Sequence, residues 1–395
     1  MISITDLSEF FEPIELKNYG FYDEGNNPRW GDLIFAYKDW GIFPNLEGAK
    51  MAIIGVGEDR SSGSNAGCGL APCEVRRFLY ELVPHSEKVD MVDLGNLRIG
   101  NTVEDTYHAL GEVVALLLSN MIIPIIIGGS ADIVYGNYLG YERIGQIINV
   151  ASVDSRIDFG YDLDSVDSRS YITKLVSKEP NYVFNLTNIG YQTYFVDAEV
   201  VDLMKELYFD SYRLGVVRDN LDNTEPLVRN ADLVAVDMGA VRQSDAPGNA
   251  YASPHGLYGE ELCKIVRYSG MSDKCTSIGF YEVNPGLDRA GQTAHLVAHA
   301  IWYFVDGYLW RKQDYPYKDK DSYRKFHVPI NDSYKIVFYR SRKSSRWWME
   351  VPVGEDKLEK YMNHYLIPCS YEDYKTALEG EIPDRWLLAF NKIKL

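Results

Sequence analysis

The sequence predicts a three-layer α/β/α domain built on a mainly parallel β-sheet. From residue 51 onward, short apolar runs rich in Ile and Val alternate with segments of helical period. The apolar runs are continuous rather than alternating, which is typical of strands that are covered on both faces. A chain of 395 residues, 46% of them hydrophobic, is long enough to bury one large core or two smaller ones.

The expected elements follow one another in a regular order. Strands are expected at 51–56, 89–94, 122–127, 146–152, 182–189, 231–237 and 276–283. Helices are expected at 103–120, 131–142, 197–209, 258–268 and 291–311. Residues 334–351 alternate like a hairpin around the polar turn SRKSS, and a last helix is expected at 384–392. We therefore divide the chain into an N-terminal cap (1–48), an α/β domain (49–312) and a C-terminal extension packed on that domain (313–395).

Charge and composition narrow the choice of partner and compartment. The net charge of −17 argues against nucleic acid, and no apolar run reaches the roughly 20 residues of a membrane span. The N-terminus lacks the features of a signal peptide, and the five scattered cysteines suit a reducing compartment, so we expect a cytoplasmic protein.

The C-terminal segment differs in character from the rest of the chain. Residues 311–395 carry a net charge of +4, against −21 for residues 1–310. This asymmetry predicts that the tail docks on the acidic body, with a separate anionic partner as the alternative. The motif RWWMEV at 346–351 is interpreted as packing within the tail, or alternatively as an exposed patch for a protein partner.

Polar residues follow four of the expected strands, at the point where each strand ends. Ligands of a parallel sheet bind beyond the carboxyl ends of its strands, so these side chains are expected to line a pocket. The candidates, in chain order, are Ser130, Asp132, Asp154, Arg156, Asp158, Asp237 and Glu282.

Six fragments resemble sequence motifs of the ureohydrolase superfamily and occur in the same order; this superfamily comprises arginase, agmatinase and formimidoylglutamase. They are IGVGEDRSSGSNAGCGLAPCEVRRFL, VDLGN, the strand ending in Gly128-Gly129, NIGYQTYFV, DAPGNAYASPHGLYGEEL, and EVNPGLD with Thr293. The chain resembles this family over roughly residues 50–310, and NIGYQTYFV is particularly like formimidoylglutamase. The resemblance implies an arginase-like fold, hydrolysis of amidine or guanidine C–N bonds at two manganese ions, and a homo-oligomer.

The metal motifs depart from the pattern of that family, which holds its ions with G-G-D-H, D-A-H-x-D and D-x-D segments. By this resemblance Asp154, Asp158 and Asp237 match three of six ligands, all of them carboxylates. The remaining positions of these motifs, including both imidazoles, fall on Ser130, Ala131, Arg156 and Gly239.

Arg156 stands two residues after Asp154 and two before Asp158. A guanidinium has no free lone pair for a metal, and clustered carboxylates repel each other unless a cation lies among them. We therefore expect Arg156 to lie within salt-bridge distance of at least one of the three aspartates and to replace the lost cation. The alternative is that Arg156 points to solvent and one Mn²⁺ persists on the aspartates.

Two further residues or segments bear on the reaction that the resemblance implies. The loop 159–180 contains no histidine, whereas the family uses one on this loop to move protons. Glu282 matches the acid that binds a guanidinium in the family, although it could equally pair with an arginine of this chain.

Three functions therefore remain open. The first is a pseudoenzyme without a cofactor, acting as a binding or scaffold protein. The second is an active C–N hydrolase with one Mn²⁺ on Asp154, Asp158 and Asp237. The third is a sensor that binds a small guanidino or amidine ligand at Glu282 without cleaving it. Another copy of the chain or a different protein is the expected macromolecular partner.

Overall fold

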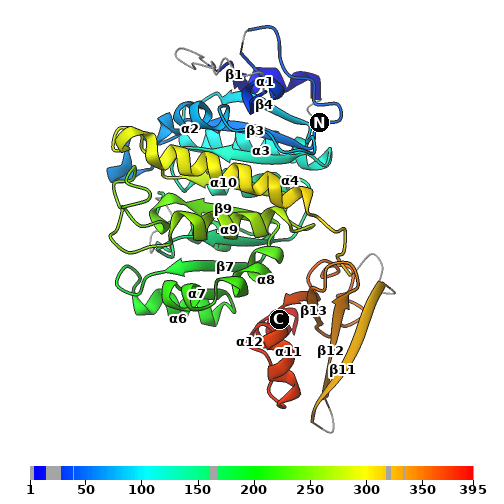
Figure 1. The fold of residues 1–395 in the computed structure, drawn as a ribbon. Helices are drawn as coiled ribbons and strands as arrows, with labels where there is room; N and C mark the ends of the chain where they lie inside the picture. Colours follow the sequence, from blue (N-terminus) through cyan, green and yellow to red (C-terminus); the bar gives the residue numbers. More distant parts are fainter. Residues whose placement is uncertain are drawn as a thin grey trace.

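The computed structural model describes residues 4–14, 28–38, 40–160, 167–316, 322–331 and 334–394. These residues form a ten-stranded main sheet with helices on both faces, followed by a separate four-stranded sheet (Figure 1). The predicted α/β/α class, with a C-terminal hairpin-and-helix extension, is thereby confirmed. Parts of the expected N-terminal cap and residues 161–166 of the loop 159–180 lie outside the described residues.

The main sheet is parallel except at one edge. Its strands are β1 (Phe11–Glu12), β2 (Phe35–Ala36), β3 (Met51–Val56), β4 (Met91–Leu97), β5 (Ile123–Ile127), β6 (Ile148–Val153), β7 (Val183–Tyr191), β8 (Asp210–Arg213), β9 (Leu233–Asp237) and β10 (Ser277–Tyr281). They lie in the order β1-β4-β3-β5-β10-β9-β6-β7-β8, with β2 also paired to β4. Only the β1–β4 pair is antiparallel. All seven strands predicted for this domain are present, whereas β1, β2 and β8 are short and were not predicted.

The helices of this domain cover both faces of the sheet. They are α1 (Trp30–Leu33), α2 (Ala71–Leu79), α3 (Val103–Ser119), α4 (Ile133–Arg143), α5 (Tyr171–Ser177), α6 (Ala198–Glu206), α7 (Leu214–Asp219), α8 (Thr224–Arg229), α9 (Gly259–Gly270) and α10 (Gln292–Leu309). Short 3-10 helices are η1 (Ile4–Phe10), η2 (Gly63–Asn65), η3 (Cys68–Leu70), η4 (Leu221–Asn223), η5 (Met238–Ala240) and η6 (Arg289–Gly291). No helix among the described residues combines the length and apolar character that a membrane crossing requires.

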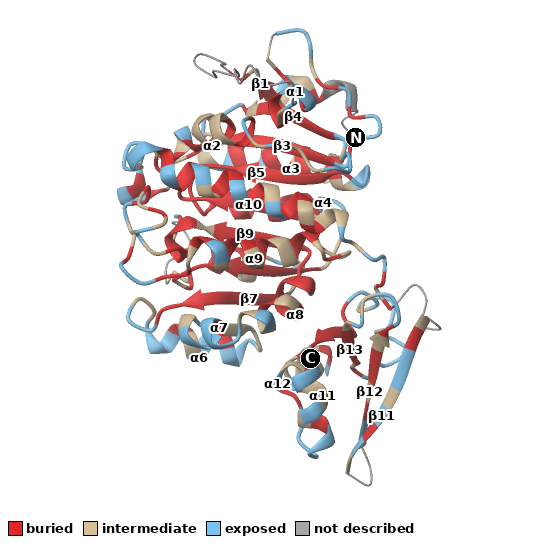
Figure 2. Cartoon of the chain, viewed as in Figure 1, coloured by how far each residue is buried: buried red, intermediate tan, exposed pale blue. Residues whose placement is uncertain are grey.

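Each central strand contributes to two hydrophobic cores. In β3, Ile53 belongs to the core on the side of α2, α9 and α10, whereas its neighbour Ile54 belongs to the core on the side of α3 and α4. Successive side chains of a strand point to opposite faces, so continuous apolar runs serve both layers. Figure 2 shows the central strands as a continuous buried layer between the partly exposed helices. This rigid layer carries the residues that follow the strands.

The extension forms its own antiparallel sheet and two helices. Its elements are β11 (Tyr323–Asn331), β12 (Tyr334–Ser341), β13 (Trp347–Glu350), β14 (Leu366–Cys369), α11 (Tyr371–Leu378) and α12 (Asp384–Lys394). The predicted hairpin corresponds to β12 and β13. Trp347 and Trp348 are only 8% and 1% exposed, as expected if they pack within the tail rather than form an exposed patch.

Side chains of opposite charge join the extension to the body. Arg346 of the extension forms an ion pair with Glu225 of α8, with Nε 3.1 Å from Oε1. In the other direction, Arg229 of α8 donates a hydrogen bond from Nη2 to the carbonyl oxygen of Trp347 (3.1 Å) and lies 4.3 Å above the ring of Trp348. The contact therefore combines an ion pair with a hydrogen bond and a cation–π contact.

Candidate functional site

Four neighbouring strands of the sheet deliver the candidate residues to one edge. Strands β5, β10, β9 and β6 are consecutive in the strand order and parallel, so their carboxyl ends meet. Such an edge is where ligands bind in open α/β sheets. The strands lead, in that order, to Ser130 and Asp132, to Glu282, to Asp237, and to the segment containing Asp154, Arg156 and Asp158.

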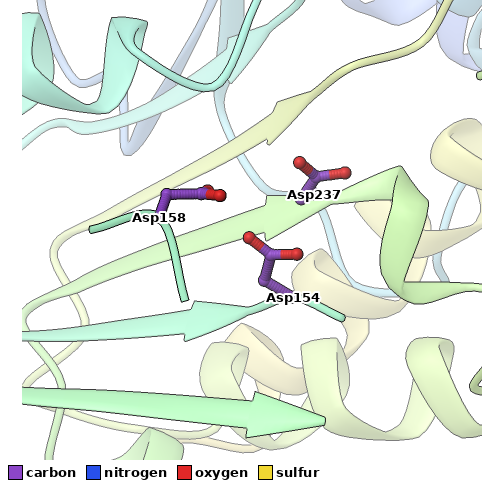
Figure 3. Close-up of side chains that lie close together, drawn as sticks. All are labelled: Asp154, Asp158 and Asp237. Carbon is purple, nitrogen blue, oxygen red and sulfur yellow. The ribbon is translucent and has the colours of Figure 1, made fainter. Parts of the chain in front are cut away.

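Three of the predicted acids form a tight cluster, which we call the aspartate triad: Asp154, Asp158 and Asp237 (Figure 3). One carboxylate oxygen of each lies within 4.8 Å of the others. Asp154 accepts a hydrogen bond at Oδ1 from the backbone N–H of Arg156 (2.9 Å), and Asp237 accepts one at Oδ1 from that of Gly239 (2.6 Å). The Oδ2 atom of Asp158 is buried without a hydrogen-bond partner in the described part of the chain. The triad thus has acceptor capacity to spare.

The electrostatics of the triad favour either protons or a cation. Burial raises the pKa of Asp154, Asp158 and Asp237, because removal from water disfavours the charged carboxylate. The charge of Asp154 raises the pKa of the other two further. A divalent cation would offset both effects, and three carboxylate oxygens are donors that suit Mn²⁺ or Mg²⁺. The residues present therefore fit one such ion.

Glu282 lies next to the triad with its carboxylate oriented by neutral donors. The backbone N–H of Ala131 donates to Oε1 (2.8 Å), and Asn65 donates from Nδ2 to Oε2 (2.7 Å). Burial raises the pKa of Glu282 to about 7. Its backbone adopts φ = +64°, a conformation that costs energy outside glycine and that occurs preferentially at functional sites. No arginine among the described residues pairs with Glu282, so the alternative of a structural ion pair is wrong.

Ser130 and Asp132 lie in the buried wall beside Glu282. Both are fully buried, and the backbone N–H of Ser130 donates to the carbonyl oxygen of Glu58 (3.0 Å). Tyr107 donates its hydroxyl hydrogen bond to Oδ2 of Asp132, while Oδ1 has no partner in the described structure. Burial raises the pKa of Asp132 to about 6. This acid therefore adds a further buried, titratable group behind the pocket.

The side chain of Arg156 does not make the contacts that were predicted for it. Its Nη1 donates to the carbonyl oxygen of Phe195 (3.3 Å), and the guanidinium carbon lies 4.3 Å from the centre of that ring. Among the residues that the structure describes, its guanidinium forms no ion pair with the triad, and only its backbone N–H contacts Asp154. The predicted salt bridge is therefore wrong, because the carbonyl and the ring of Phe195 hold the side chain instead.

Ala131 and Gly239 offer no side chain that could bind a metal. The backbone N–H of Ala131 is committed to Glu282, and Gly239 donates its own to Asp237. A Cβ atom added at Gly239 would lie only 2.9 Å from Oδ1 of Asp237. Together with Arg156, these residues occupy the three ligand positions of the family resemblance that contribute no donor.

Arg169 is a second cation near the triad, and sequence reasoning missed it. Its guanidinium carbon lies 3.5 Å from the ring centre of Tyr251. Its charge lowers the pKa of Asp154 and Asp237 and so partly opposes the burial that raises both. It belongs to the loop 159–180, for which the family resemblance implies a histidine and no arginine. No apolar strand precedes it, so no sequence pattern marks it.

Comparisons with known proteins agree with this architecture. The arginase family model matches residues 49–306. The chain is similar to the formimidoylglutamases of Lysinibacillus sphaericus (24% identity over 65% of this chain and 84% of the relative) and Geobacillus kaustophilus (28% over 60% and 77%).

Solved structures give the same result for the fold. The formimidoylglutamase of Bacillus subtilis superposes with a TM-score of 0.66 at 23% identity, covering 76% of this chain and 97% of that one. The formiminoglutamase of Trypanosoma cruzi, solved with Mn²⁺, gives 0.64 at 20% identity, covering 72% and 100%. With the family model matched over most of the parallel sheet and its helices, the chain belongs to the arginase family.

Proposed function

We propose that this protein is an arginase-family binding protein that holds one divalent cation on the aspartate triad and has lost two-metal hydrolysis. One observation carries the proposal. Three carboxylates converge within 4.8 Å, whereas Ala131, Arg156 and Gly239 present no metal donor at the positions of the other three ligands. The site therefore retains one set of hard oxygen ligands and lacks a second.

The expectation of a site without any cofactor depended on Arg156 lying among the aspartates. Its guanidinium packs on Phe195 instead, so it leaves the carboxylates without a directly bound positive charge. The buried, unpartnered Oδ2 of Asp158 is a further acceptor that an ion would satisfy. When bound, such an ion would polarise an oxygen or nitrogen atom of the ligand.

Loss of the two-metal reaction follows from the missing donors. Two-metal hydrolysis uses a pair of ions to generate and stabilise charged oxygens. Here neither imidazole is present, and the loop 159–180 provides no histidine for proton transfer. Glu282, by contrast, is held in place by Ala131 and Asn65. Recognition of a guanidino or amidine group at this carboxylate is therefore the function that the remaining residues support.

Metal analysis after loading with Mn²⁺ and desalting tests the proposal. We expect about one equivalent in the wild type and a loss of at least tenfold in affinity for Asp158→Asn, since one of three ligands is removed. Asp132→Asn is the matched control, because Asp132 is an equally buried acid outside the triad. Two equivalents in the wild type would contradict the loss of the second site, and none would contradict the cation.

A second candidate function is a hydrolase with a single metal, and the spare acceptor on Asp158 favours it. Product release from arginine, agmatine and formiminoglutamate should be measured with the metal-loaded protein. Turnover that disappears in Asp158→Asn would establish hydrolysis and overturn the binding-protein proposal. Thermal shifts with these compounds, without turnover, would support it.

We also propose that the protein is cytoplasmic, self-associates and divides at residues 48 and 312 into the three segments predicted above. All five cysteines are free thiols, which suits a reducing compartment. Light scattering coupled to size-exclusion chromatography measures the oligomeric state, and limited proteolysis tests the boundaries. A monomer, or cleavage only within the segments, would contradict the respective proposal.

A further inference from the structure

We propose that His295 and His299 form a separate metal site, which binds a divalent transition-metal ion such as Zn²⁺ on the outer face of α10. The inference goes beyond the proposed function and does not depend on the aspartate triad. It starts from two exposed imidazoles that lie side by side. Neither ring has a hydrogen-bond or ion-pair partner within the described part of the chain.

The helix α10 brings the two imidazoles to one face. Residues four positions apart on a helix are neighbours, one turn from each other. This helix lies in the outer layer, where it packs against α2 and α9 (Figure 1). Ala294 and Ala298 of α10 are buried in the core, whereas His295 and His299 are exposed. The position of the pair is therefore fixed by the way in which the helix buries its apolar side.

The two rings are close enough to share one ion. Their centres lie 4.4 Å apart, and their planes are inclined by 50°. Zinc binds imidazole nitrogens at about 2.0–2.1 Å, so tetrahedral coordination by both rings needs two nitrogens about 3.3 Å apart. Rotation about the side-chain bonds is enough to bring rings at this separation to that distance. The backbone of α10 therefore does not have to move when the ion binds.

Phe78 of α2 orients the first imidazole. Its ring stacks on that of His295, with the centres 4.5 Å apart and the planes inclined by only 13°. An imidazole binds a metal through a nitrogen lone pair, which lies in the plane of the ring. A stacked neighbour therefore restricts the rotation of His295 without covering its nitrogen atoms.

The positive charges around the pair are balanced by acids. The two histidines line a surface pocket of about 640 Å³. The cationic side chains that line this pocket each form an ion pair: Arg242 with Asp245 (2.9 Å), Lys264 with Asp222 (2.7 Å) and Arg267 with Asp306 (2.5 Å). Beside the pocket, Arg77 lies 4.3 Å from the ring centre of Phe78 and pairs with Glu74 (3.1 Å). An ion at the pair therefore meets little net positive charge.

The type of ligand separates this site from the triad. Imidazole suits Zn²⁺, whereas carboxylate oxygens suit Mn²⁺ and Mg²⁺. Among the described residues, only the aspartate triad brings three ligand atoms within 4.8 Å of one another. The pair therefore supplies two ligands, and water completes the coordination of the ion.

Calorimetric titration of the tag-free protein with Zn²⁺ at pH 7.5 tests the site, because an ordinary imidazole is mostly neutral at this pH. The titration uses Asp158→Asn, in which the triad lacks one of its ligands. We expect about one equivalent of Zn²⁺ to bind to this variant. Adding His295→Gln or His299→Gln should weaken the binding at least tenfold, since a single imidazole remains.

His108→Gln in the same background is the matched control. His108 is also exposed, but it is the only histidine of its helix, α3, so Zn²⁺ binding should be unchanged. No bound Zn²⁺ in Asp158→Asn, or binding that stays the same when either His295 or His299 is replaced, would overturn the site. The Mn²⁺ content of His299→Gln alone should equal that of the wild type, and a lower content would contradict the independence of the two sites.

Discussion

Asp132→Asn is expected to stabilise the metal-free protein at neutral pH. Asp132 is fully buried, and Oδ1 has no partner in the described structure. An ionised carboxylate in this position loses its hydration without an opposing cation. Asparagine has nearly the same shape, keeps an oxygen that can accept from Tyr107, and carries no charge. The substitution therefore removes a cost of folding without creating a cavity.

The size of the effect follows from the pKa of Asp132. The pKa is raised by burial from 3.8 to about 6 in the folded protein. A folded-state pKa above the unfolded value means that the folded state holds the proton more tightly. Stability is then lost as pH rises from about 4 through about 6 and stays low above that range. At 1.36 kcal/mol per pKa unit the full loss is about 3 kcal/mol, and about half of it is present at pH 5.

Urea unfolding at pH 5.0 and pH 7.5, with chelator present, measures this effect. The stabilisation of Asp132→Asn over the wild type should grow by about 1 kcal/mol between these pH values. Asp93→Asn is the control, because Asp93 is equally buried but pairs with Arg76 (2.8 Å), so that this substitution should destabilise at both pH values. An Asp132→Asn variant that is destabilised at pH 7.5, or whose difference from the wild type does not change with pH, would refute the reasoning.

Three further substitutions or conditions have defined outcomes. The Mn²⁺ affinity should fall as pH is lowered from 8 to 6, because the raised pKa values of Asp154, Asp158 and Asp237 make protons compete with the ion. Calorimetry in two buffers should show proton release on binding, and an affinity that does not change with pH would contradict this prediction. Gly239→Ala should weaken Mn²⁺ binding by about tenfold, since its Cβ would lie 2.9 Å from Oδ1 of Asp237 and shift this ligand; unchanged metal content after desalting would argue against it. Trp386→Ala should destabilise the extension by about 3–5 kcal/mol, because Trp386 is 1% exposed and donates a hydrogen bond from Nε1 to the carbonyl oxygen of Glu350 (2.8 Å). Hydrogen exchange in β12 and β13 should then become faster relative to exchange in the main sheet.

The main sheet could be predicted from the sequence because burial on both faces leaves a strong pattern. In β5, five apolar or proline residues in succession are all buried. Strand β8 has no such pattern: its sequence is DSYR, and it lies at the edge of the sheet, where one row of hydrogen bonds and a few partly buried side chains suffice. Its position depends on pairing with β7, which is information that local sequence does not contain.

In the candidate site, the carboxylates could be predicted from the sequence, whereas the placement of the cationic side chains could not. Asp154, Asp158 and Asp237 were predictable because they follow apolar strands that are neighbours in the sheet. The direction of the Arg156 side chain was not, because it depends on Phe195, 39 residues further along the chain. Arg169 is likewise placed by its contact with Tyr251, which a different loop supplies. Carboxylates at strand ends are fixed by the backbone, whereas long cationic side chains are placed by distant partners.

The orientation of Arg156 decides what an arginine means at a position where the family resemblance implies a histidine. As a cation among the aspartates it would have taken the place of a metal ion, whereas its guanidinium packs on Phe195 and forms no ion pair with the triad among the described residues. The three positions at which the family resemblance implies further ligands follow three different strands, β5, β6 and β9, so a donor placed at one of them cannot complete a second site. Arg156→His alone should therefore bind no second Mn²⁺. Combining it with Ala131→His and Gly239→Asp would supply a donor at all three positions, but the Cβ at position 239 would lie 2.9 Å from Oδ1 of Asp237, so a second equivalent also requires that this ligand shift. A second equivalent bound by Arg156→His alone would show that the vacant positions are less decisive than the geometry indicates.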